Sequence, residues 1–253
     1  MLFKDKLKEP VIYKGSNKAV EELEQVQEYL KEHSDKDLEK KAKLIQYGID
    51  GEKNILFELK NSHFPMYVLH DVYMVDHDLS AQIDYIIITP SMVYFIECKN
   101  LIGTIMIDAM GNFTREYTYN GKIIKEGIYS PITQSQRHLD LYKSLRAKRQ
   151  GTVMKFIYDK TFSNNFKSLV VLANPKSILK SRYAPKEIKD KVIKADQLID
   201  YIKRHEQSAF RNQKDMIELA DIFLSYHQDK EIQSIQKENN SVIEEKTIHL
   251  LND

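Results

Sequence analysis

The spacing of apolar residues divides the chain into a helical first part, a strand-rich middle and a helical last part. Residues 17–47 are rich in Lys, Glu, Leu and Gln and poor in β-branched residues, which predicts one or two helices with a break near 33–35. Residues 48–60 continue the helical pattern, which ends before Pro65. We therefore expect helices to precede the first strand of this pattern.

From residue 67 onward, short β-rich runs are separated by turn residues. Two of these runs, 113–119 and 122–125, flank Asn120–Gly121, a dipeptide that strongly favours a hairpin turn. The other runs predict strands at 67–75, 81–89, 92–99, 103–107 and 168–172.

Helices return after the strands. Pro is well tolerated in the first turn of a helix, so one helix is predicted from Pro131 to about Lys148, with others at 195–205 and 213–226. This order predicts an α/β fold with a mixed central β-sheet flanked by α-helices and extra helices at both ends. The expected divisions are an N-terminal helical extension (1–40), a core (41–150), the C-terminal part of the α/β domain (151–227) and a polar tail (228–253).

Composition narrows the class of protein. The chain has 253 residues and a net charge of +1, from 38 Lys and Arg against 37 Asp and Glu, so nucleic-acid binding would have to rest on local features. Its single Cys excludes an intramolecular disulfide and a Cys-based zinc finger. No apolar run approaches the roughly 18–20 residues that span a bilayer, and the first residues are charged, unlike a signal peptide. We expect a soluble, cytoplasmic protein without a membrane partner.

The segment from Gln82 to Lys99 carries the main chemical signal. If Pro90–Ser91 is a two-residue turn, Asp84 lies opposite Glu97 and Gln82 opposite Lys99. These four side chains then share one face of a mostly apolar hairpin, with Ile83, Tyr85 and Cys98 on the other face.

Charges on such a surface are costly unless they are paired or bind a metal. Two facing carboxylates can hold Mg²⁺, and a nearby Lys can hold a water or stabilise charge in the transition state. The alternative is a buried ion pair between Lys99 and Asp84 or Glu97, without catalysis, and structural ion pairs of this kind are common.

Another carboxylate, Glu52, falls on the apolar stripe of the preceding helix, between residues that include Ile49 and Leu56. Gly48 and Gly51 flank this region, which favours a close backbone approach. The alternative is a helix that begins only at Asp50, with Glu52 in its first turn. The sequence does not separate the two interpretations.

The helix predicted from Pro131 places Gln134 and His138 on the same stripe as the apolar Leu141 and Leu145. Such a Gln and His could reach a phosphate or orient a water, although for His138 alone an ordinary helix-start residue is the favoured interpretation. Basic residues cluster around this helix, which is consistent with phosphate contacts, although a solvated helix face is the commoner cause. They are Lys122, Lys125, Arg137, Lys143, Arg146, Lys148 and Arg149.

Together these segments resemble the nuclease-related domain (NERD) family of the PD-(D/E)xK nuclease superfamily, over roughly residues 47–145. The resemblance rests on Gly48-x-x-Gly51-Glu52, Gln82-Ile83-Asp84-Tyr85, Glu97-Cys98-Lys99-Asn100 with Gly103 following, and Pro131-x-x-Gln134. It implies a restriction-endonuclease-like core with acidic residues at one edge of a mixed sheet. It also implies Mg²⁺-dependent (or Mn²⁺-dependent) hydrolysis of phosphodiester bonds, with DNA the favoured substrate.

The resemblance implies a role for each matching residue. Asp84 and Glu97 match the metal ligands, and Lys99 matches the catalytic lysine. The backbone carbonyl of Cys98 matches a further metal ligand, whereas its thiol would face away from the acids and is not expected to be a nucleophile. Two positions outside this motif also match: Glu52 is the helix acid that helps to organise the metal indirectly, and Gln134 touches substrate or site. Ile83 stands where the superfamily name has Pro.

Two other functions compete with the nuclease. One is a nucleic-acid-binding module that has kept the fold but cleaves little or not at all. The other is a protein-interaction adaptor that uses the helical ends, which could also carry a homo-oligomer contact. For both the nuclease and the nucleic-acid-binding module, the expected nucleic-acid contacts are Arg137, His138, Lys122, Lys125 and Arg146.

Overall fold

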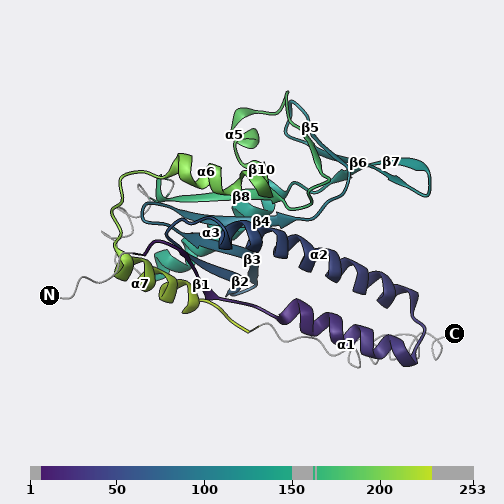
Figure 1. Ribbon diagram of the computed structural model, residues 1–253, viewed down its shortest axis with the longest axis horizontal. Coiled ribbons are helices and arrows are strands. Elements are labelled where there is room, and N and C mark those ends of the chain that lie inside the picture. The colour runs from purple at the N-terminus through teal and green to yellow at the C-terminus, as the bar shows by residue number, and fades with distance from the viewer. Residues whose placement is uncertain (1–6, 150–161, 163, 230–253) are drawn as a thin grey trace. The chain divides into compact units, whose positions relative to one another are not determined.

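A computed structural model of the protein describes residues 7–149, 162 and 164–229 (Figure 1). The chain divides into two compact units: residues 1–15 with 50–228, and residues 16–49 with 229–253. The candidate chemistry lies in the first of these units. Nearly all of the predicted polar tail lies outside the described residues.

The elements run along the chain from a short first strand to a final helix. In order, they are β1 (Pro10–Lys14), α1 (Lys18–Glu32), α2 (Lys36–Lys60), β2 (Met66–Asp76), β3 (Leu79–Ile88), β4 (Val93–Lys99), β5 (Thr104–Ile107), β6 (Phe113–Tyr119), β7 (Lys122–Ile128), α3 (Pro131–Lys148), β8 (Phe166–Leu172), β9 (Ile178–Lys180), α5 (Lys186–Lys189), β10 (Val192–Lys194), the 3₁₀ turn η1 (Ala195–Gln197), α6 (Leu198–His205) and α7 (Gln213–Leu224).

The central sheet has six strands in the order β1-β2-β3-β4-β8-β10. Strands β2, β3 and β4 are antiparallel, whereas β1 pairs with β2, and β8 with β4 and β10, in parallel. The sheet is therefore mixed, as the sequence predicts. A second sheet, β7-β6-β5-β9, contains the predicted hairpin, in which Asn120 and Gly121 both have positive φ, at 50° and 73°.

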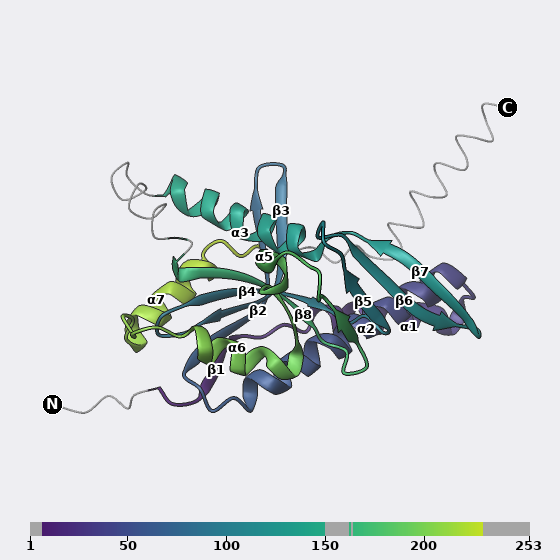
Figure 2. The same cartoon turned by 90° about the horizontal axis from the view of Figure 1, so that it is seen from above.

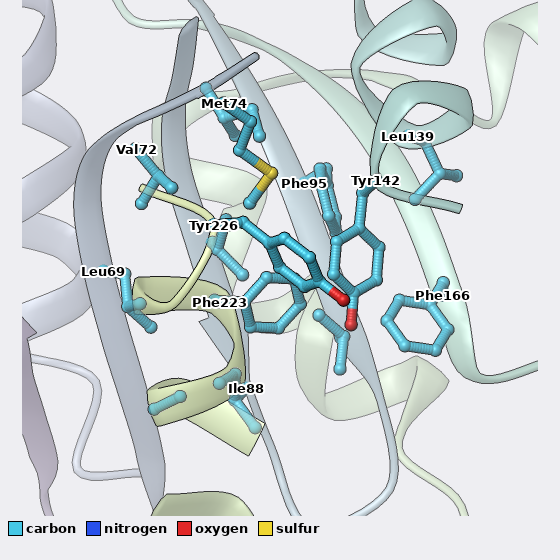
Figure 3. Packing of buried hydrophobic residues seen from close by; sticks show 14 of the residues in the cluster. Leu69, Val72, Met74, Ile88, Phe95, Leu139, Tyr142, Phe166, Phe223 and Tyr226 are labelled. Carbon is cyan, nitrogen blue, oxygen red and sulfur yellow. The ribbon is translucent and has the colours of Figure 1, made fainter. Parts of the chain in front are cut away.

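Helices cover both faces of the central sheet, and Figure 2 shows α3 and α6 on opposite sides of it. One core, which we call the α3-side core, joins the sheet to α3 and α7, with Tyr142 packed among aromatic rings (Figure 3). Its buried residues are Tyr67, Leu69, Val72, Met74, Ala81, Ile83, Ile86, Ile88, Val93, Phe95, Leu139, Leu141, Tyr142, Phe162, Phe166, Met216, Ala220, Phe223 and Tyr226.

A second core, the α2-side core, joins the opposite face of the sheet to α6 and to the C-terminal part of α2. Its buried residues are Ile55, Leu59, Met66, Val68, Tyr85, Ile87, Met92, Tyr94, Ile96, Leu169, Val171, Ala173, Ile193, Leu198, Tyr201 and Ile202. Strands β3 and β4 contribute to both cores, which explains why their sequences are apolar at nearly every position.

The main elements match the sequence-based prediction. The first helical region breaks between Glu32 and Lys36, and α3 runs from Pro131 to Lys148. The alternative in which the second helix begins at Asp50 is wrong, because α2 is continuous from Lys36 to Lys60. Four short elements were not predicted: β1, β9, β10 and α5. Among the described residues, no helix is both long enough and apolar enough to cross a bilayer.

Candidate active site

The β3–β4 hairpin has the register that a two-residue turn predicts. Thr89 N–H donates to the Met92 carbonyl at 2.9 Å, and the ladder runs as far as the pair Tyr85–Ile96. Beyond that pair the strands separate, and the Cys98 N–H donates to Asp84 Oδ2 at 2.6 Å instead. The Asp84 carboxylate is therefore fixed at the open end of the hairpin, close to the end of β4.

The strict alternation predicted for β3 fails at Asp84. Residues 71 and 84 are missing from the otherwise continuous β2–β3 pairing, and Asp71 has a φ of 56°. After this break Ile83 packs in the α3-side core, not on the face of Tyr85 as predicted. Gln82 also leaves the predicted arrangement opposite Lys99, and its amide donates to Asp71 Oδ1 at 2.9 Å.

Glu97 is the most deeply buried acid of the site, with 3% of its surface exposed. Its Oε1 accepts a hydrogen bond from Lys99 Nζ at 2.7 Å. Its buried Oε2 has no hydrogen-bond partner among the described residues, and His138 Nδ1 lies 3.5 Å from it. The ion pair with Lys99 foreseen by the non-catalytic alternative is thus present, but it satisfies only one carboxylate oxygen.

The two acids oppose one another electrostatically. Burial, and after it the charge of Glu97, raise the pKa of Asp84 well above its ordinary value. The hydrogen bond from the Cys98 N–H and the charge of Lys99 act in the opposite direction and lower this pKa. Burial likewise raises the pKa of Glu97, and Lys99 opposes this shift. A bound cation would remove the cost of keeping both carboxylates charged.

Helix α3 supplies the other side of this group. Ser130 caps the helix, and Gln134, one turn in, accepts from Lys99 Nζ through Oε1 at 3.0 Å. Lys99 is thereby held between two side-chain oxygens. His138, one turn further along, has a side chain that is 11% exposed. Burial and then the charge of Lys99 lower the pKa of His138 to about 4, so its imidazole is neutral at neutral pH.

Glu52 reaches the site from α2. Its Oε2 lies 2.8 Å from His70 Nε2, and its backbone carbonyl accepts from the Tyr85 hydroxyl at 2.9 Å. The charge of Glu52 also raises the pKa of Asp84, as expected of a neighbouring acid. The predicted close approach occurs at Gly51, where an added Cβ would lie 2.6 Å from Asn100 Cβ, whereas nothing described lies within 4 Å of that position at Gly48.

The Cys98 thiol packs with the α2-side core, on the face opposite Glu97 and Lys99. Burial and the nearby acids raise its pKa well above the ordinary value. The thiol thus lies on the face expected from sequence, and a thiol that is so difficult to ionise is a poor nucleophile.

The basic residues do not form one patch. Lys122 and Lys125 are exposed on β7, in the second sheet, whereas Arg137 is exposed near the start of α3 with its guanidinium 5.7 Å from the Tyr129 ring centre. Arg146 is partly buried on the same helix. Lys148 pairs with Asp76 at 2.6 Å, so it is engaged within the fold. These nucleic-acid contacts remain predictions.

Sequence reasoning missed His70 and the Tyr85 hydroxyl. Tyr85 was expected only as an apolar residue, and His70 was one polar residue in a strand-like run. The signal that could have found them is their position beside Asp84 in the pairing of β2 with β3, where His70 faces Tyr85. That pairing is not readable before the register of β2 is known.

The donor set suits a hard cation. No group of three or more His, Cys, Asp or Glu side chains in the described part of the chain is arranged to hold a metal. A cation bound at this site would use the Asp84 and Glu97 carboxylates, with other oxygens from backbone, water or substrate. This combination is typical of Mg²⁺, and the unpartnered Oε2 of Glu97 fits it.

The family comparison agrees with this geometry. The model of the nuclease-related domain matches residues 47–173, just over half of the chain and a range that contains every residue of the site. No curated protein and no solved structure matches the chain.

Proposed function

Because the chain belongs to the nuclease-related domain family, we propose that it is a metal-dependent nuclease that hydrolyses phosphodiester bonds of DNA. The observation that carries the proposal is the state of Glu97. One oxygen of this buried carboxylate is held by Lys99, the other lacks a hydrogen-bond donor among the described residues, and the acid lies close enough to Asp84 to raise its pKa. A structural ion pair alone would not need a second acid beside it.

In this proposal Asp84 and Glu97 hold Mg²⁺ or Mn²⁺, with the Cys98 carbonyl as a further ligand and Glu52 acting indirectly. When bound, the ion would polarise the scissile phosphate and stabilise the leaving oxygen. The Asp84 carboxylate keeps its orientation through the Cys98 N–H. The site therefore has one acid fixed by the backbone and one fixed by a lysine.

Lys99 would hold the attacking water and stabilise negative charge as it develops on the phosphate. Its ammonium group is oriented by Glu97 Oε1 and Gln134 Oε1, which leaves a third donor position for water or substrate. His138, neutral and buried beside Glu97, would limit the positions of that carboxylate.

The substrate side of the proposal rests on charge. Lys122, Lys125 and Arg137 are exposed and Arg146 is partly so, and each could neutralise a phosphate of the nucleic-acid backbone. Such contacts would give binding without reading sequence.

One observation favours the second candidate, a binding module that does not cleave. Lys99 Nζ and Glu97 Oε1, 2.7 Å apart, form an ion pair within the protein itself. Filter binding to duplex DNA in EDTA measures binding apart from cleavage. Retained binding together with no cleavage under any metal condition would support this candidate.

The test of the nuclease is incubation of the full chain with linear, circular and single-stranded DNA and with RNA, in Mg²⁺, Mn²⁺ or EDTA. Asp84→Asn and Glu97→Gln should each lower metal-dependent cleavage by about 10²–10³-fold, the usual cost of losing charge stabilisation in the transition state. Glu206→Gln is the matched control, because Glu206 is a half-buried acid that follows α6 and contacts the turn at the other end of the same hairpin. Cleavage that persists in EDTA, or in both site variants, contradicts the proposal.

A further inference from the structure

We propose that His70 is a positioning residue: its Nε2 fixes the Glu52 carboxylate beside Asp84, so that Glu52 can shape the cation site. This inference rests on the proposed function and adds to it a residue outside the motifs that identified the site. His70 contacts Glu52 and none of the acids that would bind the cation directly, so its effect would pass through Glu52.

The contact between the two side chains is short and sheltered. His70 Nε2 lies 2.8 Å from Glu52 Oε2, and the side chains are only 13% and 26% exposed. A hydrogen bond to a carboxylate in such a setting is stronger than one between neutral groups. The Glu52 carboxylate is therefore limited to orientations in which Oε2 faces His70 and Oε1 is free to turn elsewhere.

The His70 ring is itself held in place. It stacks on Tyr85 with ring centres 4.6 Å apart and planes 12° from parallel, and the Tyr85 hydroxyl donates to the Glu52 carbonyl at 2.9 Å. The stacked pair thus holds both the backbone and the side chain of Glu52. Free rotation of the imidazole would break the stack.

Hydrogen bonds from a lysine also hold the backbone at His70 and the next residue. Lys14 from β1 donates to the carbonyls of His70 and Asp71, at 2.7 and 2.6 Å. Asp71, with a φ of 56°, is where the alternation of β2 changes: Val72 turns to the α3-side core, whereas His70 faces α2. His70 keeps the alternation of Met66 and Val68, which places it on the α2 side, and the break begins only at the next residue, opposite Asp84.

Hydrogen-bonding partners of metal ligands commonly change metal affinity by about 10–100-fold. Glu52 would be such an outer group and His70 acts through it, so the effect of His70 should lie at the lower end of this range. If the role of His70 were structural only, its replacement would lower the stability of the fold but leave the cation affinity of the folded protein unchanged. The charge of Glu52 already acts on Asp84, so a displaced Glu52 would alter the electrostatic environment of the proposed cation.

The test is Mn²⁺ binding to the full chain by titration calorimetry, without nucleic acid. His70→Phe keeps a ring against Tyr85 but removes the donor, whereas His70→Gln keeps an N–H at a similar reach. We expect about 10-fold weaker Mn²⁺ binding for His70→Phe and affinity close to wild type for His70→Gln. His205→Phe is the control, because His205 also stacks on a tyrosine, Tyr201, with ring centres 4.0 Å apart.

A second comparison covers the case in which His70→Phe does not fold. His70→Gln and His70→Asn both introduce an amide, but the shorter Asn cannot reach Glu52. The inference expects Asn to lose affinity and Gln to keep it; equal affinities for the two variants would overturn it.

A double substitution tests whether His70 acts through Glu52. In a Glu52→Gln background, His70→Phe should cause little further loss of Mn²⁺ affinity, whereas independent, additive losses would overturn the inference.

Asp84→Asn distinguishes a failure of the role of His70 from a failure of the proposed cation site. If Asp84→Asn abolishes Mn²⁺ binding and His70→Phe does not change it, only the role of His70 is refuted. If Asp84→Asn binds Mn²⁺ like wild type, the cation site and the role of His70 both fail.

Discussion

The two ends of the β3–β4 hairpin each enclose an acid, yet they treat it differently. At the turn end, Glu206 Oε1 accepts from the Ser91 N–H at 2.7 Å, from the Ser91 hydroxyl, and from the Thr89 hydroxyl at 3.2 Å. At the open end, Glu97 accepts from Lys99 alone among the residues that the structure describes, and it lies beside a second acid. Both acids have a second oxygen without a hydrogen-bond partner among the described residues. They differ in the number of donors at the first oxygen, and in the second acid that lies beside Glu97 alone.

The positively charged side chains at the two ends, Arg211 and Lys99, also differ in the number of acids that they face. Arg211 lies near Glu206, where its backbone N–H donates to the Pro90 carbonyl at 3.0 Å. Burial lowers the Arg211 pKa, but the charge of Glu206 opposes this, so the guanidinium and carboxylate support one another. Lys99, in contrast, lies near two carboxylates, and its charge lowers the pKa of both Glu97 and Asp84.

Burial alone therefore does not distinguish a structural acid from a functional one. The distinguishing feature is a second carboxylate close by, which the fold tolerates at a cost in stability. Such a cost is expected where a ligand supplies the missing charge, and active sites are commonly less stable than the fold could make them.

The largest expected effect is a loss of cleavage on removal of Lys99, which would distinguish this lysine from the structural Arg211. Lys99→Met should lower metal-dependent cleavage by about 10²–10³-fold, because a positioned positive charge is lost from the transition state. Mn²⁺ binding should persist, because both proposed carboxylate ligands remain. Single-turnover cleavage and calorimetry measure the two properties separately. Wild-type cleavage in this variant would make Lys99 a structural counter-charge, like Arg211.

The next effect concerns the turn end. Glu206→Ala leaves the Ser91 N–H and hydroxyl without their acceptor and removes the charge near Arg211, which should destabilise the fold by about 3 kcal/mol. Chemical denaturation measures this loss, and cleavage per folded molecule should not change. A loss of cleavage at constant folded fraction would show that the two ends are coupled.

A third prediction tests how tightly α2 packs against the open end. Gly51→Ala would bring a Cβ to 2.6 Å from Asn100 Cβ and 3.2 Å from Cys98 Sγ, so we expect a loss of about 1–3 kcal/mol in unfolding free energy. Gly48→Ala is the matched control in the same helix, where nothing described lies within 4 Å and Ala should stabilise by about 1 kcal/mol. Equal effects of the two substitutions would contradict the close approach.

Much of this hairpin was predictable from sequence. The Pro90–Ser91 turn fixes the register, and period-two alternation then places Glu97 and Lys99 on the face that meets α3. The helical stripe that contains Gln134 predicted which residue of α3 would meet this face. These are local inferences, in which one turn or one helix start fixes the positions of its neighbours.

The rest depends on tertiary contacts. The break in alternation at Asp71 and Asp84 involves Lys14, which is far away in sequence, and a positive φ at a residue that is not Gly. Strands β9 and β10 have three residues each, too few for a period to be visible. His70 was missed because its place beside Tyr85 depends on the pairing of β2 with β3, which is itself a tertiary contact.

The smallest expected effect is a gain in stability at the open end. The raised pKa of Asp84 means that the folded protein binds this proton more tightly than the unfolded chain does. The corresponding stability is present at low pH and is lost as pH rises through the folded-state pKa. Asp84→Asn has no proton to lose and can still accept from the Cys98 N–H.

The unfolding free energy of metal-free Asp84→Asn should therefore increase relative to wild type as pH rises from about 4, the ordinary Asp pKa, toward neutral. Urea denaturation in EDTA across this range measures the difference. Mn²⁺ should reverse the order, because only the wild-type folded state would bind it tightly. A difference that is flat with pH would mean that Asp84 is charged at little cost, and the contrast between the two ends of the hairpin would then rest on hydrogen bonding alone.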